Sequence, residues 1–453
     1  MLRRIIILPL ASMIVVMANA QTGNVWTLEG CINHAIECNI NVRKQSLGTD
    51  KAKIALQEGK WAFVPSLSIS SNYTTSTGRV LDPTTYQFVQ TSLTGSGGSS
   101  ISADINLFEG GKKIYTLDKA KLSLRASLLK EESVKDDLKL NVTAAYMDVL
   151  CSREQIKIAE ESETLVKGQL ERSKRLLEAG GITESEVLQL QSQHFAAIND
   201  VSKAKHSELM ARLTLCDLLE IDDYSSFSVT PQGICNESYE TFNIESAIEN
   251  SPDYQAVLLS QSLAQSDLRI ARSILYPKIS LSVGYGSSFS DARKKSILTP
   301  DGVIKYEAYS FIQQYTDNSS AYISIGLKIP ILSGLANHNG VKRAKIAATE
   351  ARISTLEVRK ELRKKILQAR FDCKDAKDRY HRAEEEVRYA EEAQRQINEK
   401  YNLGATDYLS WNTALIELAR AKYSLIESKY RWYLKTEILR LYVFPESQEV
   451  ETE

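Results

Sequence analysis

The stretch WAFVPSLSISSNY, residues 61–73, alternates apolar and polar side chains after its proline. Leu67, Ile69 and Tyr73 form one set of the alternation, and Ser66, Ser68, Ser70 and Asn72 form the other. A period of two predicts a β-strand with one apolar and one polar face.

The same alternation occurs in three later segments, so we expect four strands, at about 64–74, 99–108, 278–288 and 320–330. The stretches between paired strands, roughly 74–99 and 286–320, are rich in Ser, Thr, Gly and Tyr and predict long surface loops. A half-buried sheet of a soluble protein would also alternate. The polar faces, however, hold mostly Ser, Asn, Asp and Gly, which favours a water-filled lumen on that side and lipid on the other.

Two long tracts without proline, between Pro83 and Pro231 and between Pro330 and Pro445, carry helix-forming residues with apolar spacings of three, four and seven. Within them, residues 112–178 contain a single glycine and residues 341–403 contain none, so each of these stretches could form helix over about 95–100 Å at 1.5 Å per residue. Such helices must pack their apolar stripes on neighbours as coiled coils.

The two halves of the chain match each other. Ala35-Ile36-Glu37 recurs as Ala247-Ile248-Glu249, and Gly180 recurs as Gly404. We therefore predict a first repeat over 21–236 and a second over 237–453. Each contains a helix, two strands around a loop, and a long helical hairpin, with tips near 179–185 and 402–407 and a C-terminal tail after the second hairpin.

Residues 1–20 have the pattern of a secretory signal peptide: two arginines, an apolar run and Ala18-Asn19-Ala20 as cleavage site. An uncleaved anchor is the alternative. The net charge of −1 gives no basic field for nucleic acid. No later segment is long and apolar enough for a spanning helix, so membrane insertion would use strands.

Catalytic motifs are not found. Cys31, His34 and Cys38 share one helix face and are possible zinc or copper ligands, but the second repeat has Asn243, Ser246 and Asn250 there, which favours ordinary packing. The glycines at 95–98 lack the Gly-Lys-Ser/Thr of a phosphate loop, and no His-Glu-x-x-His occurs. We predict no enzyme activity, no metal and no cofactor, and we interpret the six cysteines as buried thiols.

Four strands cannot close a barrel, and an open edge in lipid leaves backbone groups unpaired at several kcal/mol each. Further copies of the chain must complete the sheet; two copies give eight strands and three give twelve. A wider ring can leave a channel.

The strand entries VPSLSIS and YPKISLSV, the exits LFEGGKK and ILSGLANHNG, and the hairpin tips RLLEAGGITESEVLQLQSQ and KYNLGATDYLSWNTAL occur in matching order in both repeats. With these motifs the chain resembles the outer membrane efflux protein family, the TolC-like channel-tunnels. The resemblance implies a mainly α-helical homotrimer with a 12-stranded membrane β-barrel in the outer membrane over an α-helical tunnel in the periplasm. It also implies an equatorial belt formed by residues near 221–243 and by the C-terminal tail.

The function implied is a passive outer-membrane exit duct of a tripartite efflux or type I secretion system, with a periplasmic adaptor and an inner-membrane transporter as partners. The alternatives are a coiled-coil envelope scaffold without transport activity and a periplasmic hydrolase or metal binder. On the positions that match the family, adaptor contact is expected at Ala179, Gly180, Thr183, Glu184, Gly404, Ala405 and Thr406.

The closed aperture departs from the family pattern. Many members place acidic residues at the positions that are Ser410 and Thr413 here. The gate residues could instead be aromatic or a different acid, and the sequence leaves both open. The candidates are Tyr401, Tyr408 and Trp411, or Asp407, with Ser410 at the departing position.

Overall fold

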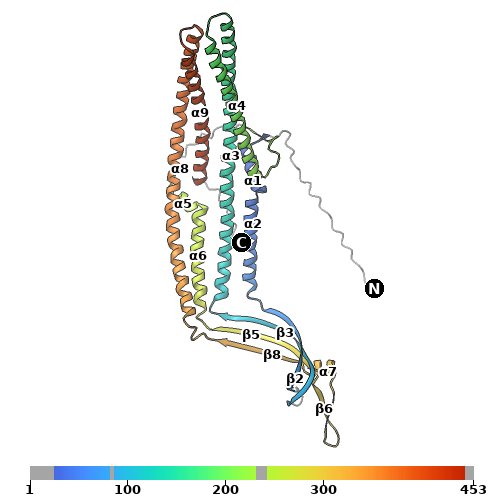
Figure 1. The fold of residues 1–453 in the computed structure, drawn as a ribbon. Helices are drawn as coiled ribbons and strands as arrows, with labels where there is room; N and C mark the ends of the chain where they lie inside the picture. Colours follow the sequence, from blue (N-terminus) through green and yellow to red (C-terminus); the bar gives the residue numbers. More distant parts are fainter. Residues whose placement is uncertain (1–24, 82–85, 231–241, 444–453) are drawn as a thin grey trace, which may run out of the picture. The chain divides into compact units, whose positions relative to one another are not determined.

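The computed structural model describes residues 25–81, 86–230 and 242–443. The expected signal peptide, residues 231–241 of the expected equatorial belt and the tail from 444 lie outside these ranges. The described chain is mostly helical and contains one four-stranded sheet (Figure 1). Within these ranges, no helix combines the length and the apolar character needed to cross a membrane.

The chain groups into two compact units that do not coincide with the two repeats. Within the described residues, unit 1 comprises 25–43, 135–230, 242 and 367–443, and unit 2 comprises 44–81, 86–134 and 243–366. Each unit therefore takes segments from both repeats, because the long helices contribute residues to both units.

The helices of unit 2 form one layer in the order α2, α3, α6, α8, with short α5 beside α8. Their bounds are α2 Ile40–Trp61, α3 Lys112–Glu178, α5 Ile244–Asn250, α6 Pro252–Ser273 and α8 Ala336–Asn402. Polar contacts join neighbours: the Thr49 hydroxyl donates to Glu131 at 2.8 Å, Lys119 pairs with Asp267 at 2.6 Å, and Thr355 donates to Gln261 at 3.1 Å. The edges of the layer are therefore α2 and α8.

The sheet of unit 2 has the order β2-β3-β5-β8, and every neighbouring pair is antiparallel. The strands are β2 Ser66–Leu81, β3 Phe88–Glu109, β5 Lys278–Ser290 and β8 Ser320–Lys328. The register aligns Ile69 with Ile101 and Ile101 with Tyr285, so the apolar positions of adjacent strands share one face. The expected four strands per chain are confirmed.

The expected loop at 74–99 is wrong, because β2 and β3 continue through most of it. Two of its glycines, Gly95 and Gly97, are strand positions covered by large neighbours. A Cβ on Gly97 would lie 2.5 Å from the Asn72 carbonyl oxygen and 3.0 Å from the Phe289 ring. The rings of Tyr73 and Phe289 stack at 6.1 Å across this glycine.

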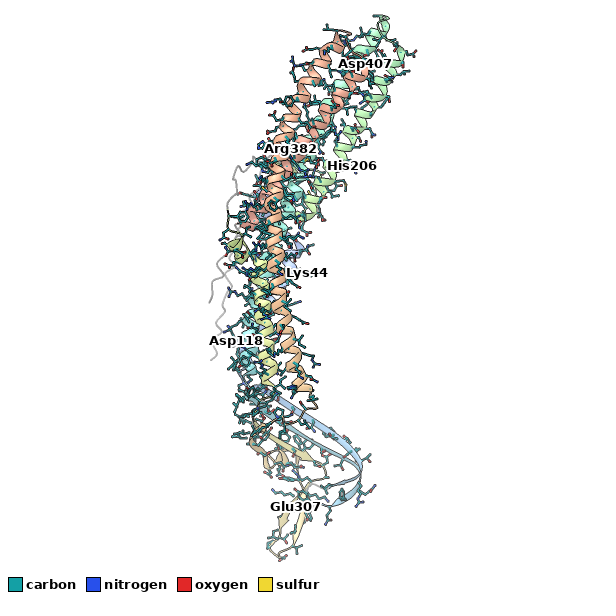
Figure 2. The ribbon with its side chains drawn as sticks, turned by 90° about the vertical axis from the view of Figure 1, so that its left-hand side faces the viewer. Lys44, Asp118, His206, Glu307, Arg382 and Asp407 are labelled. Atoms are coloured by element: carbon teal, nitrogen blue, oxygen red, sulfur yellow. The ribbon has the colours of Figure 1, made fainter. Side chains whose placement is uncertain are left out.

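The second expected loop, 286–320, also contains regular structure: β6 Lys294–Leu298, β7 Ile304–Ala308 and α7 Phe311–Asp317. Figure 2 shows Glu307 on the β6–β7 hairpin. β5 pairs with β8 only as far as Gly286, and beyond that point the Gln314 amide bonds the backbone N–H and C=O of Ser290 at 2.9 and 3.1 Å. The α7 side chain thus satisfies strand-edge groups that β8 does not reach.

Unit 1 consists of α1 Leu28–Cys38, α4 Glu184–Leu219, α9 Tyr408–Val443, parts of α3 and α8, and a parallel pair of short strands, β1 Val25–Trp26 and β4 Ser228–Val229. Contacts give the helix order α8, α9, α3, α4: Lys435 pairs with Asp372 at 2.8 Å, Lys422 with Glu161 at 3.3 Å, and Lys205 with Glu160 at 2.9 Å. The edges of this layer are α8 and α4. Tyr146 donates to the Thr230 carbonyl at 2.6 Å, and Arg153 donates to the Val229 carbonyl at 2.7 Å, which fixes β4 against α3.

Candidate functional site

The two helical hairpins of unit 1 reverse direction through the same backbone motif. After α3, the N–H of Gly180 bonds the Leu177 carbonyl at 2.9 Å and the N–H of Gly181 bonds the Leu176 carbonyl at 2.8 Å. After α8, Gly404 and Ala405 make the equivalent bonds at 3.1 and 2.8 Å. This is the Schellman helix end, which needs positive φ at its first position outside the helix. Gly180 and Gly404 supply it, with φ of 74° and 69°.

The helix that follows each turn begins with a side-chain cap at matching positions of the repeat. Thr183 accepts the Glu186 N–H at 3.4 Å, and Asp407 accepts the Ser410 N–H at 2.9 Å. Figure 2 shows Asp407 at the turn of the second hairpin. The hydrogen bonds from Ser410 lower the pKa of the Asp407 carboxyl below its ordinary value. Asp407 is therefore a charged helix cap, and its negative charge also interacts favourably with the positive end of the α9 dipole.

Trp411 joins the two hairpins near these turns. Its side chain is 3% exposed and belongs to a buried cluster that draws on α3, α4 and α9. The other members are Val166, Leu170, Val187, Leu190 and Leu415. The Tyr401 and Tyr408 rings flank Trp411 at 5.8 and 6.2 Å between centroids, and the indole N–H donates to the Asn398 side-chain oxygen at 3.0 Å. Burial raises the pKa of the Tyr408 phenol.

A second contact between the hairpins was not expected from the sequence. Arg172 of α3 donates to the side-chain oxygen of Asn402 and, at 3.2 Å, to its backbone carbonyl at the end of α8. This carbonyl is one of the last of the helix, where a cation is favourable. Arg172 and Asn402 are 230 residues apart, and no spacing rule could have paired them.

The structure thus separates the expected site residues into two groups. Ala179, Gly180, Thr183 and Glu184 are exposed at the first turn, and Gly404 and Ala405 are exposed at the second, with Thr406 half-buried. Among the expected gate residues, Trp411 is buried within the chain and Tyr401 and Tyr408 are half-buried. Asp407 and Ser410 are exposed. Adaptor contact and gating at these residues stay predictions.

The cysteine and histidine group of α1 does not converge. Cys31 is fully buried, Cys38 is exposed, and the His34 ring packs against Trp26 at 5.2 Å. The Cys38 sulfur lies 4.0 Å from the His34 Nδ1. Burial raises the pKa of the Cys31 thiol to about 12, so it is protonated at neutral pH and is a poor metal ligand there. In the described part of the chain, no three His, Cys, Asp or Glu side chains are grouped to hold a metal ion.

Comparison with known proteins finds relatives of this chain in sequence and in structure. The outer membrane protein TolC of Vibrio cholerae is 24% identical over 242 residues, which are 52% of this chain and 51% of that protein. The match thus spans about half the length of that relative. Two solved structures have a similar fold at 15% identity. The CmeC outer membrane channel of Campylobacter jejuni has a TM-score of 0.81 over 93% of this chain and 87% of its own, and VceC of Vibrio cholerae has 0.77 over 92% and 95%.

These structures share the TolC-like fold, which is mostly helical, has two repeats and contributes four strands per chain. A family model described as outer membrane efflux protein matches residues 31–219 and 243–443. Because the two matched segments cover most of the sequence, the chain belongs to the outer membrane efflux protein family.

Proposed function

We propose that this chain forms a homotrimeric exit duct in the outer membrane for a tripartite efflux or type I secretion system. The duct is a passive, non-enzymatic conduit, and a periplasmic adaptor connects it to an inner-membrane transporter that supplies the energy. Family membership supports the transport class. The observation that carries the assembly is the open four-stranded sheet, whose edge strands β2 and β8 have partners on one side only.

The sheet topology supports closure by identical copies. Its four strands alternate in direction, so β8 of one copy would meet β2 of the next in antiparallel orientation. Three copies give a ring of 12 strands without an edge, which satisfies the backbone groups that lipid cannot. A ring of eight strands would fill its interior with side chains, whereas 12 leave room for a channel.

The apolar face of the sheet has the dimensions of a membrane band. Aromatic side chains stand near both ends of it: Phe108 beside Ile279 at one end, and Tyr73 with Phe289 at the other. Ten residues of β5 separate these rows, which is about 33 Å along the strand and about 25 Å along the membrane normal at a tilt near 40°. Between the rows, Ile69 is 77% exposed and Ile323 is 76% exposed. Lipid contact accounts for such large exposed apolar side chains.

The helix layers carry apolar stripes on their edges, as a ring of copies requires. In unit 2, Leu47 and Ile54 of α2 are exposed seven residues apart, and Ile346 and Ile353 of α8 are exposed with the same spacing. In unit 1 the edge helix α4 exposes Leu188 and Phe195, again seven apart, and α8 exposes Phe371 and Tyr389. Two different edges that pack on each other generate a closed ring of copies.

The hairpin turns are the proposed docking and gating region. The exposed turn residues Ala179, Gly180, Thr183, Glu184, Gly404, Ala405 and Thr406 would contact the adaptor. Trp411 and the Arg172–Asn402 contact hold the second hairpin against the first, and release of this contact would widen the aperture. In this proposal the gate is the aromatic packing of Tyr401 and Tyr408 against Trp411, while Asp407 and Ser410 form the helix cap.

The conduit is tested with purified protein in a planar lipid bilayer. We expect a heat-sensitive trimer on unheated gels and a steady ion conductance that follows its incorporation. A folded monomer that neither inserts nor conducts would contradict the proposal and favour the scaffold alternative.

The gate is tested by Trp411→Ala and Arg172→Ala, which remove the two contacts between the hairpins. Both variants should raise single-channel conductance, because the second hairpin is freed. Leu403→Ala is the matched control: Leu403 lies in the second turn and is 84% exposed, so its truncation removes little packing. Unchanged conductance in both test variants, with folded trimers, would exclude this gate.

A further inference from the structure

Positive charge is concentrated at one end of the sheet. We define the helix-side rim as the segments that join the strands to the helices of unit 2 together with the adjoining helix ends, residues 58–65, 109–121, 267–278 and 328–345. The rim holds 12 Lys and Arg against 4 Asp and Glu. The segments at the other end of the strands, 74–99 and 286–320, hold 5 of each kind. The whole chain is almost neutral, with 56 basic and 57 acidic residues, so the excess belongs to the rim.

Exposed aromatic side chains occupy the same rim. Trp61 is 69% exposed, Tyr276 is 55% exposed and Phe63 is 43% exposed. The Lys113 ammonium lies 5.9 Å from the centre of the Phe63 ring. Amphipathic aromatic rings beside basic side chains are the composition of a membrane–water boundary, where rings lie at headgroup depth and ammonium groups reach lipid phosphates.

The rim also has a surface hollow of about 670 Å³, and Trp61, Lys112 and Lys113 line it together. The acidic side chains Glu58, Asp104 and Glu109 line the same hollow. Asp104 and Glu109 accept hydrogen bonds from Ser282 and Asn106, at 2.6 and 2.9 Å, and Glu109 lies 4.0 Å from the Lys278 ammonium. Because Trp61 and the two lysines line one hollow, quenching of Trp61 fluorescence detects groups that enter it.

We infer that the helix-side rim binds the headgroups of anionic phospholipids, such as phosphatidylglycerol, in the leaflet on the helix side of the membrane. This inference rests on the proposed function. Charge complementarity selects an anion, and the continuity of the rim with the apolar face of the sheet selects a lipid as its source. Each basic residue near an anionic surface contributes a factor of about five in partitioning at moderate ionic strength.

The experiment measures quenching of Trp61 fluorescence by brominated lipids. The full chain is inserted into phosphatidylcholine vesicles that contain an equal fraction of either dibrominated phosphatidylglycerol or dibrominated phosphatidylcholine, and insertion is confirmed by flotation. The difference between the wild type and Trp61→Phe isolates the Trp61 signal. We expect phosphatidylglycerol to be preferred by about fivefold or more at low salt, and the preference to fall as salt shortens the screening length.

The dependence on charge is tested with the double variant Lys112→Gln and Lys113→Gln, which should lose most of the preference for phosphatidylglycerol. Lys203→Gln with Lys205→Gln on α4 makes the same change in net charge away from the rim and should retain it. Equal quenching by both lipids in the floated wild type, or a preference that neither salt nor the rim substitutions reduce, would overturn the inference. Failure to float in any lipid would instead overturn the proposed function, and the inference with it.

Discussion

Gly110 links β3 to α3 at a place where only glycine fits. Its φ is 63°, and a Cβ there would lie 2.6 Å from the Ser273 carbonyl oxygen. Gly110→Ala should lower the free energy of unfolding by at least about 1–2 kcal/mol for the left-handed backbone, and by more for the clash. Gly168 is the matched control, because it lies inside α3 with nothing near its missing Cβ. Gly168→Ala should raise that free energy by about 0.5–1 kcal/mol. Denaturant titration followed by circular dichroism measures both, and shifts in the same direction would contradict this account.

The Asp407 cap gives the second turn a pH dependence of known sign. Its folded pKa is lowered from 3.8 because the Ser410 hydrogen bonds favour the carboxylate. The cap is therefore complete above pH 3.8 and is lost as pH falls through the lower folded pKa. Amide hydrogen exchange at the start of α9 should speed up over this acidic range in the wild type. Asp407→Asn, which keeps a side-chain acceptor but does not titrate there, should show no such step. A step of equal size in this variant would assign the effect to another group.

At the scale of the strand, two neighbours on β5 distinguish the faces of the sheet. Leu281 lies on the apolar face, and Ser282 lies on the polar face, where its hydroxyl donates to Asp104 at 2.6 Å. Leu281→Arg should impair trimer assembly by about 2–4 kcal/mol if the residue lies near the bilayer midplane. Ser282→Arg should assemble and change the ion selectivity of the channel. Gel mobility and reversal potential measure the two outcomes, and equal tolerance of both arginines would contradict the assigned faces.

The four strands were predictable from the sequence because apolar and polar residues alternate with period two, and the long helices because apolar residues recur at spacings of three, four and seven. The full extent of β2 and β3 was not predictable, because Gly95 and Gly97 are covered by Tyr73 and Phe289 from neighbouring strands. Such contacts join residues far apart in sequence. The β6–β7 hairpin does have a local sequence signal, because Pro300-Asp301-Gly302 forms its turn, with Gly302 at φ of 78°.

The hairpin turns show the same division between local and distant information. Gly180 and Gly404 were predictable because a reversal between helices needs positive φ, and the structure has them at 74° and 69°. The contact of Arg172 with Asn402 was not predictable, since it depends on how the two hairpins pack. Trp411 was expected near the aperture, yet its burial inside one chain follows from the same packing.

For the whole molecule, assembly is decided at the edges of its layers. Leu47 and Ile54 are 59% and 56% exposed on the outer edge of α2, although α2 packs its other face on α3. In a ring of copies these side chains would be covered by the α8 edge of a neighbour, where Ile346 and Ile353 are exposed. Isolated chains would keep them in water, so their burial would be part of the free energy of assembly.

Substitution of these two edge residues therefore separates assembly from folding. Leu47→Asp combined with Ile54→Asp should convert the heat-sensitive trimer to monomer, because a buried, unpaired carboxylate costs several kcal/mol in each of three interfaces. Helical content by circular dichroism should stay unchanged, since both side chains are exposed within one chain. Ala55 is exposed and lies about 100° around α2 from Ile54, so Ala55→Asp adds charge outside the stripe and should remain trimeric. Mass photometry in detergent gives the populations directly. A trimer in the double variant as stable as that of Ala55→Asp would show that α2 does not face a neighbouring copy, and the sheet would then need a different arrangement of copies to close.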